Sequence, residues 1–328
     1  MPKLLFFLIV FTHTIDIAAQ VKWTNVDTSF GSLPKNFHVF KTNDSLDEKP
    51  FIAYYAIANL KDKRIQFTAD STLRRRLTPQ QFYKKNREPL LVVNTTFFSY
   101  ATNQNLNVLI KDGKILGYNI HSQPGRGKDT FTYTHPLGSA LGISKKREAD
   151  IAWLFTDTLL KHIYALQHSS PAIKDSLNYL NWAHAKKYAV YTEGQQAPNN
   201  KGFKKWKMKT AIRGGPVLLQ NGEVLVSNNE ELKFAGKAIN DQHPRTCMGY
   251  TKDGKLIIMV IQGRYVDAAG ATLLQEAQLL KEIGCEEAIN LDGGGSSCML
   301  INGMETIKPS DKEGQRPVPG VFIINIKR

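Results

Sequence analysis

A run of glycine and serine residues follows an acidic side chain near the C-terminal end of the chain: Asn290-Leu291-Asp292-Gly293-Gly294-Gly295-Ser296-Ser297. Three consecutive glycines lose much conformational entropy on folding, which is wasteful in a simple turn. Successive backbone N–H groups in such a turn can point at one anion, and the two serine hydroxyls add donors. The run therefore predicts an anion- or sugar-binding loop that starts at Asp292. The plainer alternative is a tight turn with a capping aspartate.

The sequence after this run excludes the two most familiar phosphate-binding loops. A P-loop has a lysine after its last glycine and then a helix, and a dinucleotide-binding fingerprint also leads into a helix. Here the next residues are Cys298-Met299-Leu300-Ile301-Asn302-Gly303, which predict a strand and a hairpin turn. The loop is therefore expected at a sheet edge.

The segments that precede the run predict the elements that position it. Residues 288–291 predict a short strand. Residues 272–283 predict a helix, because Thr272 and Gln275 have capping-box spacing, apolar residues recur on one face, and Gly284 follows as a stop. Glu276 lies on this helix.

Most of the remaining pattern is that of antiparallel sheet. Residues 51–58, 64–69 and 90–93 predict strands, and residues 77–86 predict a short helix. Four hairpin turns are predicted at Asp112-Gly113, Asn221-Gly222, Asp253-Gly254 and Asn302-Gly303. The expected fold class is α+β, with mainly antiparallel or mixed β-sheet and flanking helices, in a single domain over residues 21–328.

One stretch departs from the sheet pattern. Residues 151–166 and 173–187 predict helices, so we interpret the stretch from about 145 to 205 as a helix-rich insertion in the domain.

The N-terminal residues predict export. Lys3, the apolar run over residues 4–11 and the small residues Ala18-Ala19 predict a signal peptide over residues 1–20; the alternative is an N-terminal anchor. Eight apolar residues are too few to span a bilayer, so no stable membrane anchor is expected. The mature chain is expected to be secreted or periplasmic.

The charge of the chain favours an acidic partner. Lysine and arginine number 43 against 29 acidic residues, a net charge of +14. Neither Arg74-Arg75-Arg76 nor Lys204-Lys205-Trp206-Lys207 belongs to a recognisable nucleic-acid module, so nucleic acid is not expected as a partner. An anionic glycan fits this charge, and a solvated basic surface without a role is the plain alternative.

Three cysteines occur, Cys247, Cys285 and Cys298. The odd number excludes a fully paired disulfide framework. One bridge with a free thiol and three buried thiols are both compatible with the sequence. No C-x-x-C pair and no His/Cys cluster has the spacing of zinc ligands.

Five separated blocks, together with the late Arg316-Pro317-Val318, resemble the phosphodiester glycosidase domain. The blocks occur in the family's order over about residues 90–320: Asn94-Thr95-Thr96-Phe97-Phe98, Arg213 to Leu218, His243 to Gly249, Gln262-Gly263-Arg264 with Gly270 to Leu273, and Asn290 to Ser297. Each block alone is weak, and their order and spacing give the resemblance its specificity.

The resemblance implies hydrolysis of a sugar–O–phosphate bond at the anomeric carbon of a phosphorylated or other anionic glycan. Asp292 is then the expected nucleophile or general base, with Glu276 as a possible second carboxylate. Arg245 and Arg264 are the leading phosphate ligands, because arginine binds phosphate in a bidentate manner. No cofactor is required, and a divalent metal at Asp292 stays open.

The same resemblance implies a set of substrate-binding residues. They are Asn94, Arg213, Gly214, Gly215, His243, Thr272, Asn290, Gly293, Gly294, Gly295, Ser296 and Ser297. For His243, a role in the turn before Pro244 is favoured over a role as acid or base.

The chain departs from the family pattern at two places. Thr95 and Thr96 stand where a small residue is usual, and Gln262 stands where an aspartate is usual. If that aspartate is catalytic in relatives, the catalytic chemistry of this chain is altered or lost. Two alternatives follow: a glycan-binding protein without turnover, and a phosphodiesterase that cuts P–O.

Overall fold

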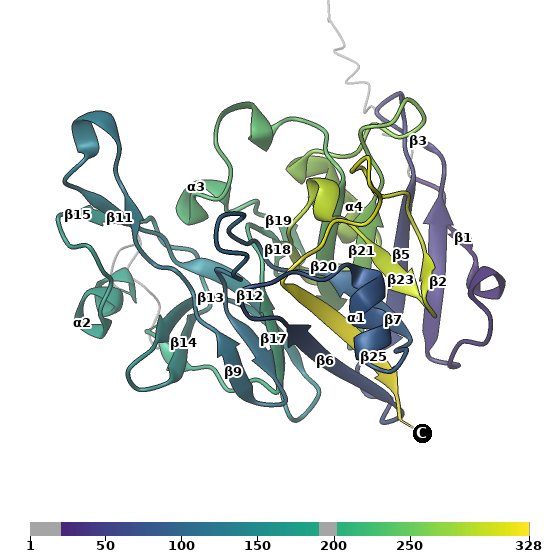
Figure 1. Ribbon diagram of the computed structural model, residues 1–328, viewed down its shortest axis with the longest axis horizontal. Helices are drawn as coiled ribbons and strands as arrows, with labels where there is room; N and C mark the ends of the chain where they lie inside the picture. Colours follow the sequence, from purple (N-terminus) through teal and green to yellow (C-terminus); the bar gives the residue numbers. More distant parts are fainter. Residues whose placement is uncertain (1–20, 190–201, 328) are drawn as a thin grey trace, which may run out of the picture.

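The computed structural model describes residues 21–189 and 202–327, and antiparallel sheets dominate this part of the chain (Figure 1). Its helices are short: α1 (Pro79–Lys85), α2 (Trp182–Ala185), α3 (Asn228–Glu231) and α4 (Leu273–Glu282), with 3-10 turns η1 (Asp27–Phe30), η2 (Gly127–Asp129), η3 (Lys186–Ala189), η4 (Gly236–Ile239) and η5 (Gly294–Ser296). The expected α+β class therefore holds only in part, because sheet far exceeds helix. The predicted signal peptide lies outside the described residues.

An eight-stranded sheet carries the strand that leads into the glycine run. Its order is β1 (Thr24–Asn25), β2 (Phe37–Thr42), β5 (Ala53–Asn59), β21 (Lys255–Ile261), β20 (Arg245–Thr251), β22 (Cys285–Asn290), β18 (Val217–Gln220) and β19 (Glu223–Val224). The sheet thereby brings the ends of β20 and β22 together, in a register that pairs Cys247 with Asn290. Two of the five sequence blocks meet at this point.

A seven-stranded sheet takes up most of the stretch that was predicted to be helical. Its order is β16 (Lys204–Lys205), β14 (His162–Leu166), β13 (Ala149–Asp157), β12 (Gly138–Ile143), β17 (Thr210–Arg213), β8 (Leu109–Lys111) and β9 (Lys114–Gly117). The helix predicted over residues 151–166 is wrong, since β13 and β14 form a hairpin there. Buried residues follow one another without a break from Ile151 to Asp157, and such a run has neither helical nor alternating periodicity.

The remaining strands form three smaller sheets. The five-stranded sheet has the order β24 (Met304–Glu305), β23 (Met299–Ile301), β7 (Leu91–Asn94), β25 (Gly320–Ile326) and β6 (Ile65–Ser71); the others are β10 (Gln123–Pro124) with β11 (Tyr133–His135) and β15 (Ile173–Asp175), and β3 (Ser45–Leu46) with β4 (Lys49–Pro50). The helix predicted over 173–187 is largely wrong, because β15 begins it and only α2 and η3 are helical.

The local signals near the glycine run are confirmed. Helix α4 begins at the N-cap Thr272 with a complete capping box, and α1 does the same at Thr78. All four Asn-Gly and Asp-Gly pairs join adjacent antiparallel strands. These signals depend on a few neighbouring residues, which explains why they could be recognised in sequence.

The three large sheets pack against one another around a shared core. Val39, Trp153 and Phe322 come from different sheets and belong to the same buried cluster. Side chains of β12 alternate between faces, so Leu141 points into this core while Ala140 joins a separate cluster on the outer face. The seven-stranded sheet therefore has a second face, away from the shared core.

Candidate active site

The glycine run forms a tight turn after β22, and each glycine is needed for a different reason. A Cβ on Gly293 would lie 2.8 Å from the Pro244 carbonyl oxygen, and Gly294 has a φ of +62°. A Cβ on Gly295 would lie 2.0 Å from Asp311 Oδ1. The run is therefore fixed by close backbone approach on one side and by a charged pair on the other.

Most amides of this turn are used inside the protein. The N–H of Gly294 donates to the Pro244 carbonyl at 2.8 Å, and those of Ser296 and Ser297 donate to Gly293 and Gly294 at 3.2 Å each. Few backbone donors therefore remain for a ligand. The groups that surround Asp292 at this turn are mainly side chains.

Two hydrogen bonds anchor the backbone of Asp292. Asn94 Nδ2 donates to the Asp292 carbonyl oxygen at 2.5 Å, and the Asp292 N–H donates to the Thr95 carbonyl oxygen at 2.8 Å. Asn94 Oδ1 accepts from Thr246 Oγ1 at 2.9 Å and from the Cys298 N–H at 3.0 Å. Asn94 is thus a positioning residue that ties β7, β20 and the turn together.

The surroundings of the Asp292 carboxylate raise its pKa to about 6. Burial is the main cause. The Ser296 hydroxyl, the charges of Lys233 and Arg316 and the Gly293 amide oppose this shift. A carboxyl group with such a pKa is ionised at neutral pH and can still take up a proton in mildly acidic solution.

Lys233 was not predicted from the sequence, yet it lies near Asp292 and near the buried Arg213 and Glu231. Burial and the charge of Arg213 lower its pKa well below the usual value, while Glu231 and Asp292 favour its charged form. Its Nζ lies 3.4 Å from the centroid of the Phe97 ring. Leu232, with a φ of +50°, ends α3 immediately before it.

Glu231 fixes the loop that presents Lys233. Its carboxylate accepts hydrogen bonds from the Ser139 hydroxyl at 2.8 Å, from the Val217 N–H at 3.0 Å and from the Ser227 hydroxyl at 2.8 Å. Arg213 is buried beside it and donates from Nη1 to Asn107 Oδ1 at 3.2 Å. No local motif marks residues 231–233, which is why sequence reasoning missed them.

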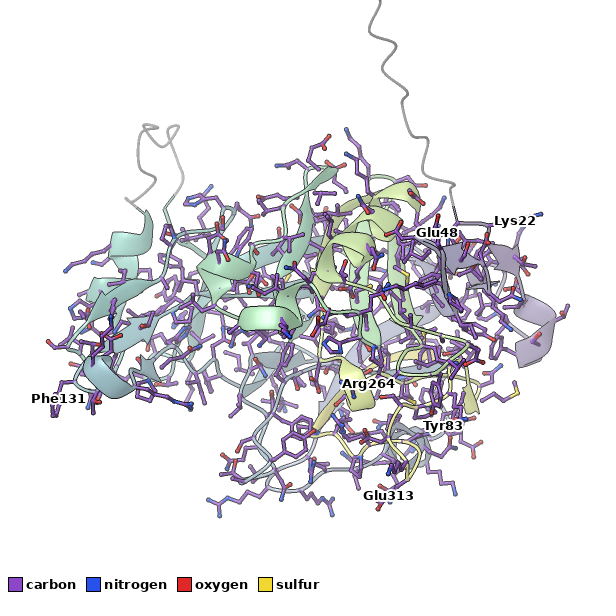
Figure 2. All side chains as sticks on the ribbon, turned by 90° about the horizontal axis from the view of Figure 1, so that it is seen from above. Lys22, Glu48, Tyr83, Phe131, Arg264 and Glu313 are labelled. Atoms are coloured by element: carbon purple, nitrogen blue, oxygen red, sulfur yellow. The ribbon has the colours of Figure 1, made fainter. Side chains whose placement is uncertain are left out.

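Two further arginines flank the turn. Arg316 donates from Nε and Nη2 to the carboxylate of Asp311 at 2.7 and 2.8 Å, and its Nη1 lies 3.5 Å from Ser296 Oγ. Arg264 is exposed, and its Nη2 would lie 3.1 Å from a Cβ on Gly294. Figure 2 shows Arg264 near the middle of the molecule and Phe131 at one end. Arg316 matched a sequence block but was not among the predicted site residues.

Arg245 and Glu276 lie beneath this site. Arg245 is 2% exposed and donates from Nε to the Ala271 carbonyl at 2.9 Å and from Nη2 to the Asp241 carbonyl at 3.2 Å. Burial raises the pKa of Glu276 to about 7, against the opposing charge of Arg245 and the neighbouring Cys247 thiol. Neither Glu276 oxygen has a hydrogen-bond partner within the two described ranges.

Several other predicted residues have clear structural contacts. The Thr272 hydroxyl caps α4 by accepting from the Gln275 N–H at 3.1 Å. The backbone of His243 pairs with Ala271, and burial, followed by the charges of Arg245 and Arg264, lowers the pKa of its ring. These contacts explain the residues as supports of the site.

The remaining predicted positions join β17 to β22. Asn290 Nδ2 donates to the Gly215 carbonyl at 2.8 Å, and a Cβ on Gly214 would lie 2.1 Å from the Asn290 carbonyl oxygen. Gly215 has a φ of +109° and faces the Glu231 carboxylate. The hydroxyls of Thr95, Thr96 and Ser297 are buried and lack hydrogen-bond partners in the described part of the chain.

Gln262 has a structural contact of its own. Its Oε1 accepts from the Lys308 N–H at 2.9 Å, and it is largely buried. This contact holds the segment that leads to Asp311 and Arg316. An aspartate oxygen is also an acceptor, so the glutamine preserves the acceptor chemistry that this contact requires.

Comparison with known proteins adds to this geometry. Residues 165–325 match the model of the phosphodiester glycosidase family. The mouse N-acetylglucosamine-1-phosphodiester alpha-N-acetylglucosaminidase is 31% identical over 101 residues, which are 30% of this chain and 19% of that protein. The alignment thus spans about a fifth of the length of the curated relative.

Two solved structures share the fold. The catalytic domain of the zebrafish enzyme of the same name, auto-inhibited by its pro-peptide, has a TM-score of 0.56 at 20% identity and covers 93% of this chain and 88% of that one. A hypothetical protein from Synechocystis has a TM-score of 0.58 at 14% identity, covering 90% and 64%. At these identities the likeness concerns the fold.

Proposed function

Because residues 165–325 match the model of the phosphodiester glycosidase family, we propose that this protein hydrolyses the glycosidic C–O bond of a sugar-1-phosphodiester. The observation that carries the proposal is the half-buried Asp292 carboxylate, held on the glycine turn between Lys233 and Arg316. A carboxylate among cations suits a substrate that joins an electrophilic carbon to a phosphate.

In this proposal Asp292 acts on the anomeric carbon. Its ionised carboxylate attacks that carbon or activates a water molecule opposite an oxocarbenium-like transition state. The electron pair of the breaking C–O bond passes to the phosphate oxygen. Because the second pKa of a phosphate monoester is about 6, this group leaves with little need of a proton donor.

The cationic side chains have the complementary task of stabilising the departing phosphate. Arg264 is exposed beside the turn, and Arg316 and Lys233 approach Asp292 from other elements. Arginine binds phosphate oxygens through paired N–H groups, and such charge-assisted bonds are stronger than neutral ones. Arg245 and Glu276 then support the site from below, since the Arg245 N–H groups already bind carbonyl oxygens.

The proposal assigns no role to a divalent metal. The charged groups around Asp292 are cations, and a metal ion there would be repelled by Lys233 and Arg316. Residues 21–189 and 202–327 contain no group of three or more His, Cys, Asp or Glu side chains placed to hold a metal ion. We therefore expect turnover to be insensitive to a chelator.

The proposal also includes export of the mature chain, on the basis of the N-terminal pattern over residues 1–20. No helix in the described ranges is long and apolar enough to cross a membrane. A protein located outside the cytoplasm would meet glycans of the cell surface or the surrounding medium.

The test is a screen of the purified protein against sugar-1-phosphodiesters, with and without EDTA. Release of the free sugar together with a phosphate monoester is expected in both conditions. Hydrolysis in 18O-labelled water should place the label in the sugar. Label in the phosphate would instead show cleavage of P–O, and tight binding without any product would favour the inactive glycan-binding alternative.

A further inference from the structure

Three adjoining cavities lie along one end of the seven-stranded sheet, away from Asp292; two are on its outer side, and the third is at the edge of the shared core, where Phe67 and Ile143 line it. The central cavity has a volume of about 700 Å³, and its neighbours have about 210 and 240 Å³. Ser144 and Lys145 line both the central cavity and one neighbour, while Lys205 and Trp206 line both the central cavity and the other. The three cavities therefore adjoin one another, and we call them together the basic groove.

The walls of the basic groove are strongly cationic. Ten lysines and Arg147 line it against two carboxylates, Asp112 and Glu148; the lysines are Lys63, Lys114, Lys145, Lys146, Lys161, Lys204, Lys205, Lys207, Lys209 and Lys327. Within residues 21–189 and 202–327, none of the ten lysines forms an ion pair with an acidic side chain. Eleven of the 43 lysine and arginine residues of the chain thus line the groove, with two carboxylates among them.

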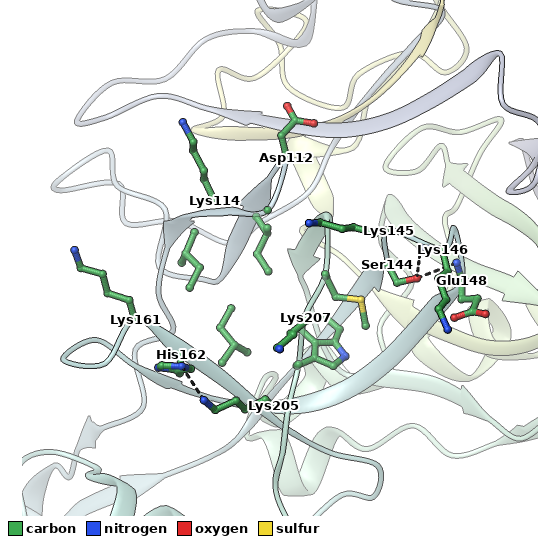
Figure 3. A pocket seen from close by; sticks show the side chains of 16 residues that line it. Asp112, Lys114, Ser144, Lys145, Lys146, Glu148, Lys161, His162, Lys205 and Lys207 are labelled. Carbon is green, nitrogen blue, oxygen red and sulfur yellow. Dashed lines mark hydrogen bonds between the residues drawn. The ribbon is translucent and has the colours of Figure 1, made fainter.

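The lysines come from separate elements around an apolar floor. Figure 3 shows Lys114, Lys145, Lys161 and Lys207 projecting from different segments around the central cavity. Trp206 forms part of the floor: it is 7% exposed, and a Cβ on Gly142 would lie 2.6 Å from its ring. Lysine ammonium groups above an apolar floor suit a ligand that has both apolar faces of its rings and negatively charged groups.

Sequence periodicity accounts for this arrangement. Residues 204–209 read Lys-Lys-Trp-Lys-Met-Lys, and Trp206 and Met208 pack on the outer cluster of the sheet while Lys207 is exposed. Alternating side chains of an extended segment point to opposite sides. The segment therefore closes the floor with its apolar residues and lines the groove with its lysines.

We propose that the basic groove binds a linear anionic polysaccharide, one whose sugar units carry regularly spaced negative charges. Its linear form and its row of unpaired lysines match such a chain along several units, and its apolar floor accommodates sugar ring faces. The inference does not depend on the proposed function, because the groove shares no residue with the site around Asp292.

The groove is at the other end of β12 from that site. Ser139 on β12 contacts Glu231, and Ser144, five residues further on, lines the groove. At about 3.3 Å per residue, these two positions are roughly 16 Å apart along the strand. A polymer held in the groove would therefore leave the reacting position unoccupied.

Other anionic partners fit the groove less well. Single-stranded nucleic acid binds by stacking its bases on exposed aromatic rings. The exposed aromatic side chains in the described ranges are Tyr100, Phe131 and Tyr179, and none of them lines the groove. A membrane surface would meet the exposed Leu159 and Leu160 beside Lys161, but a concave row of lysines does not conform to a flat bilayer.

The experiment measures binding of a galacturonate decamer to the whole protein by calorimetry, with a neutral maltodextrin of equal length as the reference. The uronate should bind and the neutral chain should not, and affinity should fall steeply with added salt. The triple variant Lys114→Gln/Lys145→Gln/Lys207→Gln should bind the uronate at least 10-fold more weakly. The matched control Lys35→Gln/Lys84→Gln/Lys252→Gln, which changes exposed lysines outside the groove, should lose less than 2-fold.

Two further measurements separate this proposal from its competitors. Turnover of a small sugar-1-phosphodiester should be the same in both triple variants, and if that substrate is not turned over at all, the binding result still stands. A ten-nucleotide single strand and phosphatidylglycerol vesicles serve as competing probes. No uronate binding at low salt would overturn the proposal, as would selective loss of DNA or vesicle binding in the groove variant with uronate binding unchanged.

Discussion

At the scale of single residues, Asp292 is the group on which the proposed chemistry depends. Asp292→Asn keeps the shape of the side chain but removes its negative charge, so hydrolysis should fall by about 10²- to 10⁴-fold. The folded-state pKa of Asp292 is about 6, above the ordinary 3.8. Ionisation of this carboxyl therefore lowers the free energy of unfolding as pH rises between those values. The variant should therefore be at least as stable as the natural protein at pH 8, by thermal denaturation. Undiminished turnover would remove Asp292 from the mechanism.

Lys233 should set the alkaline limit of turnover, as Asp292 sets the acidic one. Activity should rise through pH 6 as Asp292 ionises, and it should fall in alkaline solution because burial lowers the pKa of Lys233. Lys233→Arg keeps the charge at high pH, so the alkaline limb of kcat/KM should move upward or vanish. Lys233→Met should lower activity at every pH. An unchanged alkaline limb in the arginine variant would count against this role.

Glu276 should weaken the fold as pH rises. Its folded-state pKa of about 7 exceeds the ordinary 4.5, so the unfolded chain releases this proton first and stability declines between pH 4.5 and 7. Glu276→Gln removes that dependence. The variant should match the natural protein near pH 4 and exceed it at pH 8, with a gain on the order of 3 kcal/mol in the free energy of unfolding by urea denaturation. A loss of stability at pH 8 would show that the charged Glu276–Arg245 pair stabilises the fold.

Site residues could be predicted from the sequence where they are adjacent in the chain. The glycine run and Asp292 are adjacent in the chain, so their chemistry could be predicted together. Lys233 approaches Asp292 through a loop fixed by Glu231, whose partners lie on β12, β18 and at residue 227. Because no local pattern encodes these contacts, the residue could be found only once the sheets were assembled.

At the scale of elements, Thr272 connects the helix under the site to the site itself. Its hydroxyl caps α4, so Thr272→Ala should lower stability by about 1 kcal/mol, while Thr272→Ser should retain most of the cap. If the hydroxyl serves only as a cap, KM for a sugar-1-phosphodiester should be equal in the two variants. A KM that rises only in the alanine variant would place this hydroxyl on the substrate, as the sequence analysis predicted.

Helices and strands were predicted correctly where neighbouring residues determine them, and incorrectly where tertiary packing does. N-caps and two-residue turns are determined by residues three or fewer positions apart; the predicted helix starts were confirmed at α1 and α4, and the predicted turns at four hairpins. The hairpin of β13 and β14 was missed because β13 is buried on both faces of the sheet and therefore lacks the alternating pattern of a strand. Tertiary packing there overrides local propensity.

At the scale of the whole molecule, the five blocks could be recognised in the sequence, but the basic groove could not. The five blocks suggested a single site because their order matched a family. The basic groove draws its lysines from the N-terminal turn at Lys63, from several strands of the seven-stranded sheet and from Lys327 near the C-terminus. Only the segment at 204–207 was singled out from the sequence; Lys145, Lys146 and Arg147 are also consecutive, whereas Lys63, Lys114 and Lys161 come from separate segments.

The whole molecule also decides between the two cysteine states that the sequence left open. Cys247, Cys285 and Cys298 are all free and buried; the first two belong to one core cluster and the third to another. Burial raises the pKa of each thiol, which suppresses the reactive thiolate. The thiols of the native protein should therefore not react with a thiol reagent within minutes. After unfolding in guanidinium without reductant, three thiols per chain should react. Dithiothreitol should leave the melting temperature unchanged. A count of one thiol in the unfolded chain, rising to three with reductant, would instead reveal a disulfide.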